Sequence, residues 1–147
     1  MAQARDRGLT LVELLVALVV AATLAAIALP TYRAQVLRAH RFDAMEALLS
    51  AAAAQERFHL AQGRYAAWLS GEGDGGPTLA VAPVTPGGRY RLELRDAGAD
   101  RYRAQARPVS GRGQESDTRC AVFEIESSGR RSAQDAAGRD STTECWR

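Results

Sequence analysis

The fold of this chain is decided by residues 7–14, Arg7-Gly8-Leu9-Thr10-Leu11-Val12-Glu13-Leu14, and by the apolar run that continues from them to Leu29. A short basic leader ends at Gly8. Of the 21 residues from Leu9 to Leu29, only two threonines and Glu13 are polar. At 1.5 Å per residue, a helix over this run is about 30 Å long, close to the hydrocarbon thickness of a bilayer. The run therefore predicts a membrane-spanning helix.

The carboxylate of Glu13 needs a physical explanation, because an ionised side chain in hydrocarbon costs about 2.5–3.5 kcal/mol even on the mild insertion scale. Glu13 lies about one turn from the helix start, so its side chain can extend to the headgroups. The alternative is a cation supplied by a second copy of the chain. If the leader is cut after Gly8, the freed amine of Leu9 is that cation, and it can pair with the carboxylate between neighbouring helices.

The segment Gly8-Leu9-Thr10-Leu11-Val12-Glu13 and the apolar run together resemble the prepilin signature, a class III signal sequence, of type IV pilins and type II secretion pseudopilins. In that family a membrane peptidase cuts after the glycine and methylates the new amino terminus, and the apolar helices form the core of a filament. The resemblance implies that Gly8 is the cleavage site, Leu9 the N-methylated first residue and Glu13 the assembly residue. Leu9 replaces the usual phenylalanine, which we expect to matter little because the chemistry falls on the backbone amine.

A conventional secretory signal is the rival interpretation, and Ala26-Ile27-Ala28 offers it a small-residue cleavage site. The run is long for such a signal, however, and a carboxylate near its start is unusual. Arginines flank the run on both sides, so charge does not fix its orientation. We take the outward-facing C-terminal part from the resemblance and from the cysteines.

The composition limits what the rest of the chain can be. At 147 residues, the chain has room for one domain beyond the helix. The net charge of +2 does not by itself imply a polyanionic partner, and all 19 basic residues are arginine, so a single arginine carries little information. The two cysteines, Cys120 and Cys145, fit one disulfide in an oxidising compartment. A bond over this loop stabilises a small domain by roughly 3–3.5 kcal/mol.

Pro30 removes a backbone donor, so it predicts a kink or an interruption of the helix just beyond the membrane. From Thr31 to about Gln62 the pattern is helical again, and Gly63 is a natural end. One face of a 3.6-residue wheel carries Leu37, Phe42, Met45, Leu48, Leu49, Ala52, Ala53 and Leu60, and Phe58 falls outside this face. We expect this amphipathic half of the helix to pack on a globular head.

Residues 64–88 are rich in Gly and Pro and predict an exposed loop. Residues 71–76 match G-x-G-x-x-G formally, but no strand precedes them, and the carboxylates of Glu72 and Asp74 would repel phosphate. The same two carboxylates are weak evidence for a calcium site, because a fuller ligand set is missing.

Alternating apolar and polar residues predict a hairpin of two strands, 89–95 and 101–107, joined by a turn at residues 96–100. A third strand is expected over residues 121–126 and a short fourth over residues 130–133. The predicted fold class is α+β, and the resemblance implies a pilin fold. In this fold the long N-terminal helix packs on an antiparallel meander of three to four strands with a C-terminal disulfide loop.

The polar face of the predicted hairpin is the one arrangement that suggests a ligand. Its arginines are Arg89, Arg91, Arg95, Arg101, Arg103 and Arg107. Against them stand only Glu93 and Gln105, which leaves a surplus of five positive charges (six minus one). Such a patch can bind phosphates in a salt-sensitive way. The simpler interpretation, which the sequence favours, is a solvated sheet surface in a chain without lysine.

No catalytic or metal-binding motif is present in the sequence. His40 and His59 have no cysteine or carboxylate cluster at metal-ligand spacing, so both are expected to be ordinary helix-surface residues. Glu124 and Glu126 share a strand face, but nothing marks a pocket around them. We therefore expect neither enzyme activity nor a metal or other cofactor.

The whole sequence predicts a minor subunit of a type IV pilus. The run Gln114, Asp117, Cys120, then Gly129 and Cys145-Trp146, resembles the C-terminal part of PilE-type minor pilins. The predicted segments are a leader (1–8), a transmembrane and filament-core helix (9–29), an amphipathic half of the helix (30–63) and a globular pilin head (64–147).

The resemblance also implies partners and a location. The partners are the prepilin peptidase, the inner-membrane pilus assembly machinery and other pilin subunits. The chain would lie in the inner membrane of a Gram-negative bacterium with its head in the periplasm, and then in an extracellular pilus that serves adhesion, twitching motility or DNA uptake. Two alternatives remain open: a type II secretion pseudopilin, and a DNA-binding receptor pilin.

Overall fold

The structure is a computed structural model that describes residues 10–73 and 75–147. In chain order, its elements are α1 (Leu11–Gln62), β1 (Trp68–Leu69), β2 (Thr78–Leu79), β3 (Tyr90–Arg95), β4 (Arg103–Pro108), the 3₁₀ turn η1 (Gln114–Ser116), β5 (Val122–Glu126), β6 (Arg131–Gln134) and α2 (Thr142–Cys145). Gly8 and Leu9, the predicted cleavage site and first mature residue, lie outside the described residues.

Helix α1 begins with a capping box, a reciprocal pair of hydrogen bonds at the helix start. The backbone N–H of Glu13 donates to Thr10 Oγ1 at 3.2 Å, and the backbone N–H of Thr10 donates to Glu13 Oε2 at 3.4 Å. The helix then continues through Pro30 to Gln62, so the predicted interruption at Pro30 is not seen, and a kink there stays a prediction. By length and composition, α1 is the one helix in the described part of the chain that could cross a membrane.

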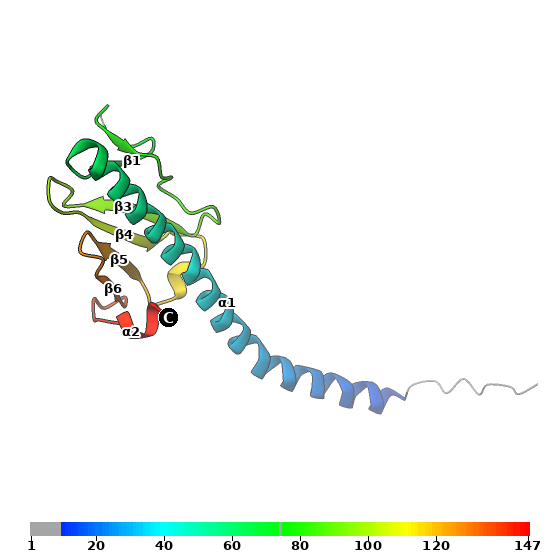
Figure 1. Cartoon of the computed structure of the whole chain (residues 1–147). Helices are drawn as coiled ribbons and strands as arrows, with labels where there is room; N and C mark the ends of the chain where they lie inside the picture. Colours follow the sequence, from blue (N-terminus) through cyan, green and yellow to red (C-terminus); the bar gives the residue numbers. More distant parts are fainter. Residues whose placement is uncertain (1–9, 74) are drawn as a thin grey trace, which may run out of the picture. The chain divides into compact units, whose positions relative to one another are not determined.

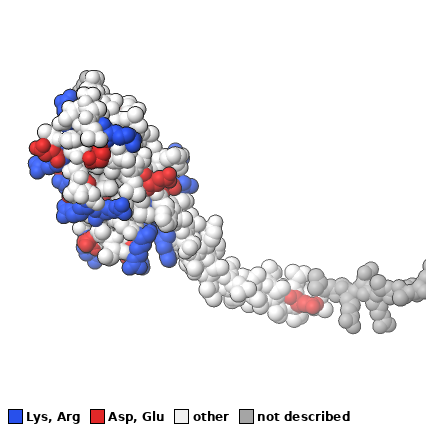
Figure 2. Space-filling view, in the orientation of Figure 1, with Lys and Arg blue, Asp and Glu red and all other residues white. Residues whose placement is uncertain are grey.

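The described chain divides into two compact units, one ending at Val36 and the other running from Leu37 to Arg147. The large apolar side chains of α1 between Leu11 and Leu29 are exposed. Figure 2 shows this part of the helix almost free of charged atoms, apart from acidic atoms at its start. An apolar surface of this length is suited to lipid or to other apolar helices rather than to water. The unit from Leu37 to Arg147 is called the C-terminal unit below.

In the C-terminal unit, α1 covers one face of a four-stranded antiparallel sheet with the order β3-β4-β5-β6 (Figure 1). The inner face of the sheet supplies the core residues Tyr90, Leu92, Ala104, Ala106, Phe123 and Ile125. Because consecutive residues of a strand point to opposite faces, the alternating pattern of the sequence places these side chains under the helix. The predicted meander is confirmed, with each of the four strands within two residues of its predicted bounds.

The helix face that packs on the sheet differs from the predicted face. The buried residues of α1 are Arg41, Ala44, Met45, Leu48, Ala51 and Gln55. Phe42, Leu49 and Leu60, which were predicted to lie on the packing face, are exposed. The face is rotated because alanines allow the helix to lie close to the sheet, and because the two buried polar side chains find partners inside. Phe58, predicted to lie outside the face, packs against a second core cluster.

The buried amide of Gln55 shows how such a polar residue is accommodated. Its Nε2 donates to the carbonyl oxygen of Ala66 at 2.8 Å, and its Oε1 accepts from the N–H of Ala66 at 2.9 Å. Both halves of the amide are therefore satisfied, so its burial has little cost. The pair fixes the chain where it leaves α1 and starts toward β1.

Residues 64–73 and 75–88 contain more regular structure than the predicted loop. Strands β1 and β2 pair in parallel, and the following residues cover the outer edge of β3. There the N–H of Leu92 donates to the carbonyl of Pro83 at 2.8 Å, and the N–H of Thr85 donates to the carbonyl of Tyr90 at 2.9 Å. Covering an edge strand removes a surface on which other chains could add a strand.

The predicted disulfide between Cys120 and Cys145 is confirmed. Both cysteines are buried in the main core cluster beside Phe123 and Ala133. The bond therefore ties the C-terminal segment, with α2, to the strands that it follows.

Candidate functional site

The outer face of the sheet, opposite α1, carries the polar residues of β3 to β6. The pairing of the strands sorts these residues into three rows that run across the strands. The first basic row is Arg91 and Arg107, continued by Val122 and Gln134. The middle row is Glu93, Gln105, Glu124 and Ser132. The second basic row is Arg95, Arg103, Glu126 and Arg130.

In the first basic row, two positive charges face each other without a carboxylate between them. Arg91 of β3 pairs directly with Arg107 of β4, and both side chains are exposed. Among the described residues, the guanidinium of Arg107 donates to the amide oxygen of Gln105 alone, at 3.1 Å. Among the described residues, no carboxylate lies within ion-pair distance of either guanidinium. Like charges directly opposite each other destabilise a sheet, so this pair is suited to an external anion.

The middle row holds two carboxylates on either side of an amide. Gln105 Nε2 donates to Glu124 Oε2 at 2.5 Å, while Gln105 Oε1 accepts from Arg107. Both ends of this amide are therefore occupied, and Gln105 holds Glu124 in place. Glu93 accepts one hydrogen bond, from Arg95. Each glutamate thus keeps one carboxylate oxygen that has no protein donor among the described residues.

The second basic row is largely compensated by carboxylates. Arg95 donates to Glu93, and Arg103 donates to Asp96 at 2.6 Å. At the other end of the row, Arg130 donates to Glu126 at 2.6 Å. The hydrogen bond from Arg130 lowers the pKa of Glu126 below its ordinary value. The side chains of these three arginines remain 45–72% exposed, so they can still contact a ligand.

Four of the six predicted arginines lie in these rows, and two do not. Arg89 precedes β3 and bonds Asp43 of α1 at 3.3 Å, so it is directed away from the outer face. Arg101 lies in the turn between β3 and β4. Across the whole face, five arginines in the two basic rows stand against three glutamates, which leaves +2 rather than the predicted surplus of five. Glu124 and Glu126 of β5, and Arg130 just before β6, were missing from the predicted face because they lie outside the hairpin.

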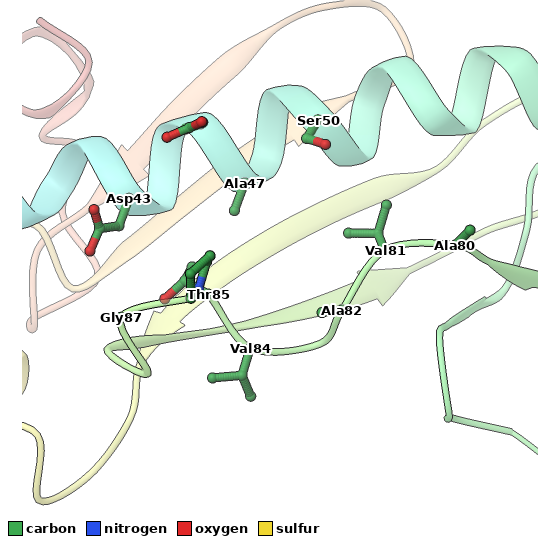
Figure 3. A pocket seen from close by; sticks show the side chains of 11 residues that line it. Asp43, Ala47, Ser50, Ala80, Val81, Ala82, Val84, Thr85 and Gly87 are labelled. Atoms are coloured by element: carbon green, nitrogen blue, oxygen red, sulfur yellow. The ribbon is translucent and has the colours of Figure 1, made fainter.

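A second feature of the C-terminal unit is a pocket of about 440 Å³ between α1 and residues 80–87. Figure 3 shows Asp43 and Ala47 of α1 on one side of it and Val81 and Val84 of the loop on the other. The lining is mostly apolar, and Glu46 adds a second carboxylate. A pocket with two carboxylates and an apolar lining is not suited to phosphate.

The two histidines are structural rather than simple surface residues. Nδ1 of His40 lies 3.1 Å from Oε1 of Gln114. The ring of His59 stacks on Tyr65 with a centroid distance of 4.4 Å, and its Nε2 lies 3.1 Å from the carbonyl oxygen of Ala99. In the described part of the chain, no three His, Cys, Asp or Glu side chains gather to hold a metal ion. Asp74, half of the weak calcium hypothesis, lies outside the described residues.

Comparisons with known proteins give two family matches. The family described as type IV minor pilin ComP, DNA uptake sequence receptor, matches residues 30–124, which is 95 of the 147 residues. The prokaryotic N-terminal methylation motif matches residues 3–29. Among solved structures, a type IV pilin from Shewanella oneidensis is similar at 24% identity and a TM-score of 0.43, over 65% of this chain and 89% of that chain. Among curated proteins, no relative matches.

Proposed function

The chain belongs to the family of type IV minor pilins described as ComP, DNA uptake sequence receptor, and we propose that it binds duplex DNA as a minor subunit of a pilus. The predicted resemblance to type IV pilins is confirmed by this membership. The family is one of pilus subunits, not of enzymes, and not of secretion pseudopilins. The DNA-receptor alternative is better supported than the interpretation that the sequence alone favours, a subunit whose arginines are only solvated.

One observation in the structure carries the proposal. The family match includes β3 and β4. On these strands Arg91 and Arg107 face each other, and neither forms an ion pair with a carboxylate of the described residues. Two guanidinium groups on a rigid sheet can donate to the oxygens of a backbone phosphate. The exposed arginines of the second basic row supply further phosphate contacts on the same face.

The test is duplex binding by the full chain in detergent micelles. In the variant R91Q/R107Q, we expect weaker binding to every duplex, whatever its sequence, because phosphate contacts carry no sequence information. Each lost contact should also reduce the slope of log K against log salt by about 0.9. The double variant should therefore lower the slope by up to about 1.8.

A matched control removes the same charge elsewhere. Arg119 and Arg139 are exposed, pair with Glu144 and Asp135, and lie outside the three rows. The variant R119Q/R139Q should bind DNA with the affinity and the salt slope of the wild type. Equal losses in both double variants would show a general charge effect, and no loss in R91Q/R107Q would refute the proposed site.

The membrane and filament part of the function rests on the N-terminal segment. The methylation motif over residues 3–29 supports cleavage after Gly8 by a prepilin peptidase, N-methylation of Leu9 and assembly through α1, with Glu13 as the assembly residue. Before assembly, the subunit is held in the inner membrane with its C-terminal unit in the periplasm, and afterwards it is part of an extracellular pilus. The intact mass of the mature chain tests this: it should begin at methylated Leu9, and a chain starting at Leu29 would refute the prepilin route.

A further inference from the structure

The arrangement of charge on the outer face suggests more than general affinity for phosphate. In antiparallel sheets, like charges placed directly opposite each other are destabilising, so a surface arranged for stability alternates sign between neighbouring strands. This face does the reverse on β3 and β4: Arg91 faces Arg107, and Arg95 faces Arg103. The two arginine pairs are separated along the strands by the middle row, which carries carboxylates and an amide.

The spacing of the rows matches one groove of duplex DNA. The two basic rows are four residues apart along the strands, which is about 13 Å at the rise of an antiparallel strand. The major groove of B-DNA is about 12 Å wide and the minor groove about 6 Å. The two basic rows can therefore contact the phosphates on the two sides of a major groove, while the middle row faces the bases between them.

The chemistry of the middle row selects the groove as well. An ionised carboxylate accepts hydrogen bonds and repels phosphate. It can therefore favour DNA binding only where it accepts a hydrogen bond from a base N–H. The major groove presents the N4 amino group of cytosine and the N6 amino group of adenine, whereas the minor groove offers only the N2 amino group of guanine. Glu93 and Glu124 each keep one carboxylate oxygen that accepts from no donor in the described part of the chain.

We propose that Glu93 and Glu124 read base amino groups in the major groove, with cytosine N4 as the preferred donor, and that Gln105 positions Glu124 for this contact. This inference rests on the proposed DNA binding and adds the residues that determine its specificity. The two glutamates lie on β3 and β5, two strand spacings or about 10 Å apart. At 3.4 Å per base-pair step, the two bases that they read are about three base pairs apart.

The experiment selects duplexes from a randomised pool with the full chain in detergent micelles. For the wild type, we expect enrichment of cytosine at two positions about three base pairs apart. E93Q should remove the preference at one position and E124Q at the other, each by about tenfold, the scale on which one side-chain contact discriminates a base pair. Methylation of cytosine N4 at either position should weaken wild-type binding and leave the corresponding variant unaffected. Both variants should bind unselected duplex at least as well as the wild type, because a negative charge near phosphates has been removed.

A third carboxylate on the same face supplies the matched control. Glu126 belongs to the second basic row and is occupied by Arg130, so E126Q should leave the selected sequence unchanged. A wild type without sequence preference, or preferences that E93Q and E124Q do not alter, would overturn this inference while duplex binding stands. If R91Q/R107Q instead binds duplex DNA as tightly as the wild type, the proposed function on which this inference rests is refuted.

Discussion

The buried ion pair between Arg41 and Asp117 gives the sharpest prediction about stability. Arg41 Nε and Nη2 donate to the two carboxylate oxygens of Asp117 at 2.7 and 2.9 Å, and the two side chains are only 9% and 4% exposed. Gln114 is buried beside them and donates to Asp117 and to the carbonyl of Leu37, each at 3.3 Å. The network joins α1 to the turn η1, which otherwise has no apolar anchor in the core clusters.

The expected cost of breaking this pair follows from its burial. In D117A, the guanidinium of Arg41 stays in the interior without its counter-charge, which costs about 3–5 kcal/mol. A domain of this size has a total stability of about 5–15 kcal/mol, so the loss is a large share of it. At about 4 °C per kcal/mol, the melting temperature should fall by roughly 12–20 °C.

The assay is urea unfolding for the free energy and thermal unfolding for the melting temperature, on the fragment from Thr31 onward with its disulfide intact and far-UV circular dichroism as the readout. Both core clusters lie within the C-terminal unit, so the fragment contains them. As a control, E93Q breaks the exposed pair with Arg95, which should cost less than about 1 kcal/mol. The double variant R41M/D117L should recover most of the loss, because it removes both charges. A cost below 1 kcal/mol for D117A would refute the reasoning.

Three other perturbations test separate parts of the molecule. E13Q keeps the capping box and removes the charge, whereas E13A removes both. We expect both variants to insert into membranes and both to be depleted from sheared pili. If sheared pili contain E13Q at the wild-type level, Glu13 acts as a helix cap only. Reduction of the disulfide, which closes a separation of 25 residues, should lower the free energy of unfolding by roughly 3–3.5 kcal/mol, and an unchanged urea midpoint would contradict this. Burial raises the pKa of Tyr102 to about 12 and the pKa of Tyr90 further. The unfolded chain therefore releases these protons first, at the ordinary tyrosine pKa of about 10. The free energy of unfolding should fall as the pH rises above about 10. The chain has no lysine to titrate in the same range, so Y102F should make the fall shallower, and an unchanged slope would exclude Tyr102 as a cause.

The sequence was a good guide to the sheet, because alternation of apolar and polar residues determines which side chains lie under the helix. It was a weaker guide to α1. Hydrophobicity placed Phe42 and Leu49 in the core, whereas the structure buries Arg41 and Gln55 instead. Polar residues can be buried when their partners are in place, and those partners, Asp117 among them, come from segments far along the chain. A helical wheel contains no information about such partners.

The candidate site was predictable in part for the same reason. Alternation placed Arg91, Arg95, Arg103 and Arg107 on one face, as the structure does. It could not show which arginine faces which, because that depends on the register of β3 and β4. The β5 residues that lie next to the β4 arginines could not be predicted either. A connection of 13 residues, 109–121, separates β4 from β5, and its sequence does not determine how the two strands pair.

The capping box at the start of α1 has a recognisable sequence signal, although it was not predicted from the sequence. Thr10-Leu11-Val12-Glu13 has the T-x-x-E spacing of a reciprocal cap, and the structure forms it. Glu13 therefore has a local role in the isolated chain, besides the role in assembly that the pilin family implies. The two roles are compatible, because the carboxylate can exchange a weak 3.4 Å contact for an ammonium partner in the filament.

The arginine bias of the composition explains why these residues are arginines, but it does not explain where the carboxylates lie. The C-terminal unit has 16 arginines and 15 acidic residues, so nearly every arginine could have a partner. Seven arginines do form ion pairs among the described residues, and neither Arg91 nor Arg107 is one of them. An exposed ion pair adds little stability, so pairing these two would bring the fold almost no gain, and leaving them opposed has only a small cost. The chain thus pairs seven of its other arginines but leaves these two opposed on β3 and β4, within the residues that match the family, and this contrast supports the DNA-binding surface that we propose there.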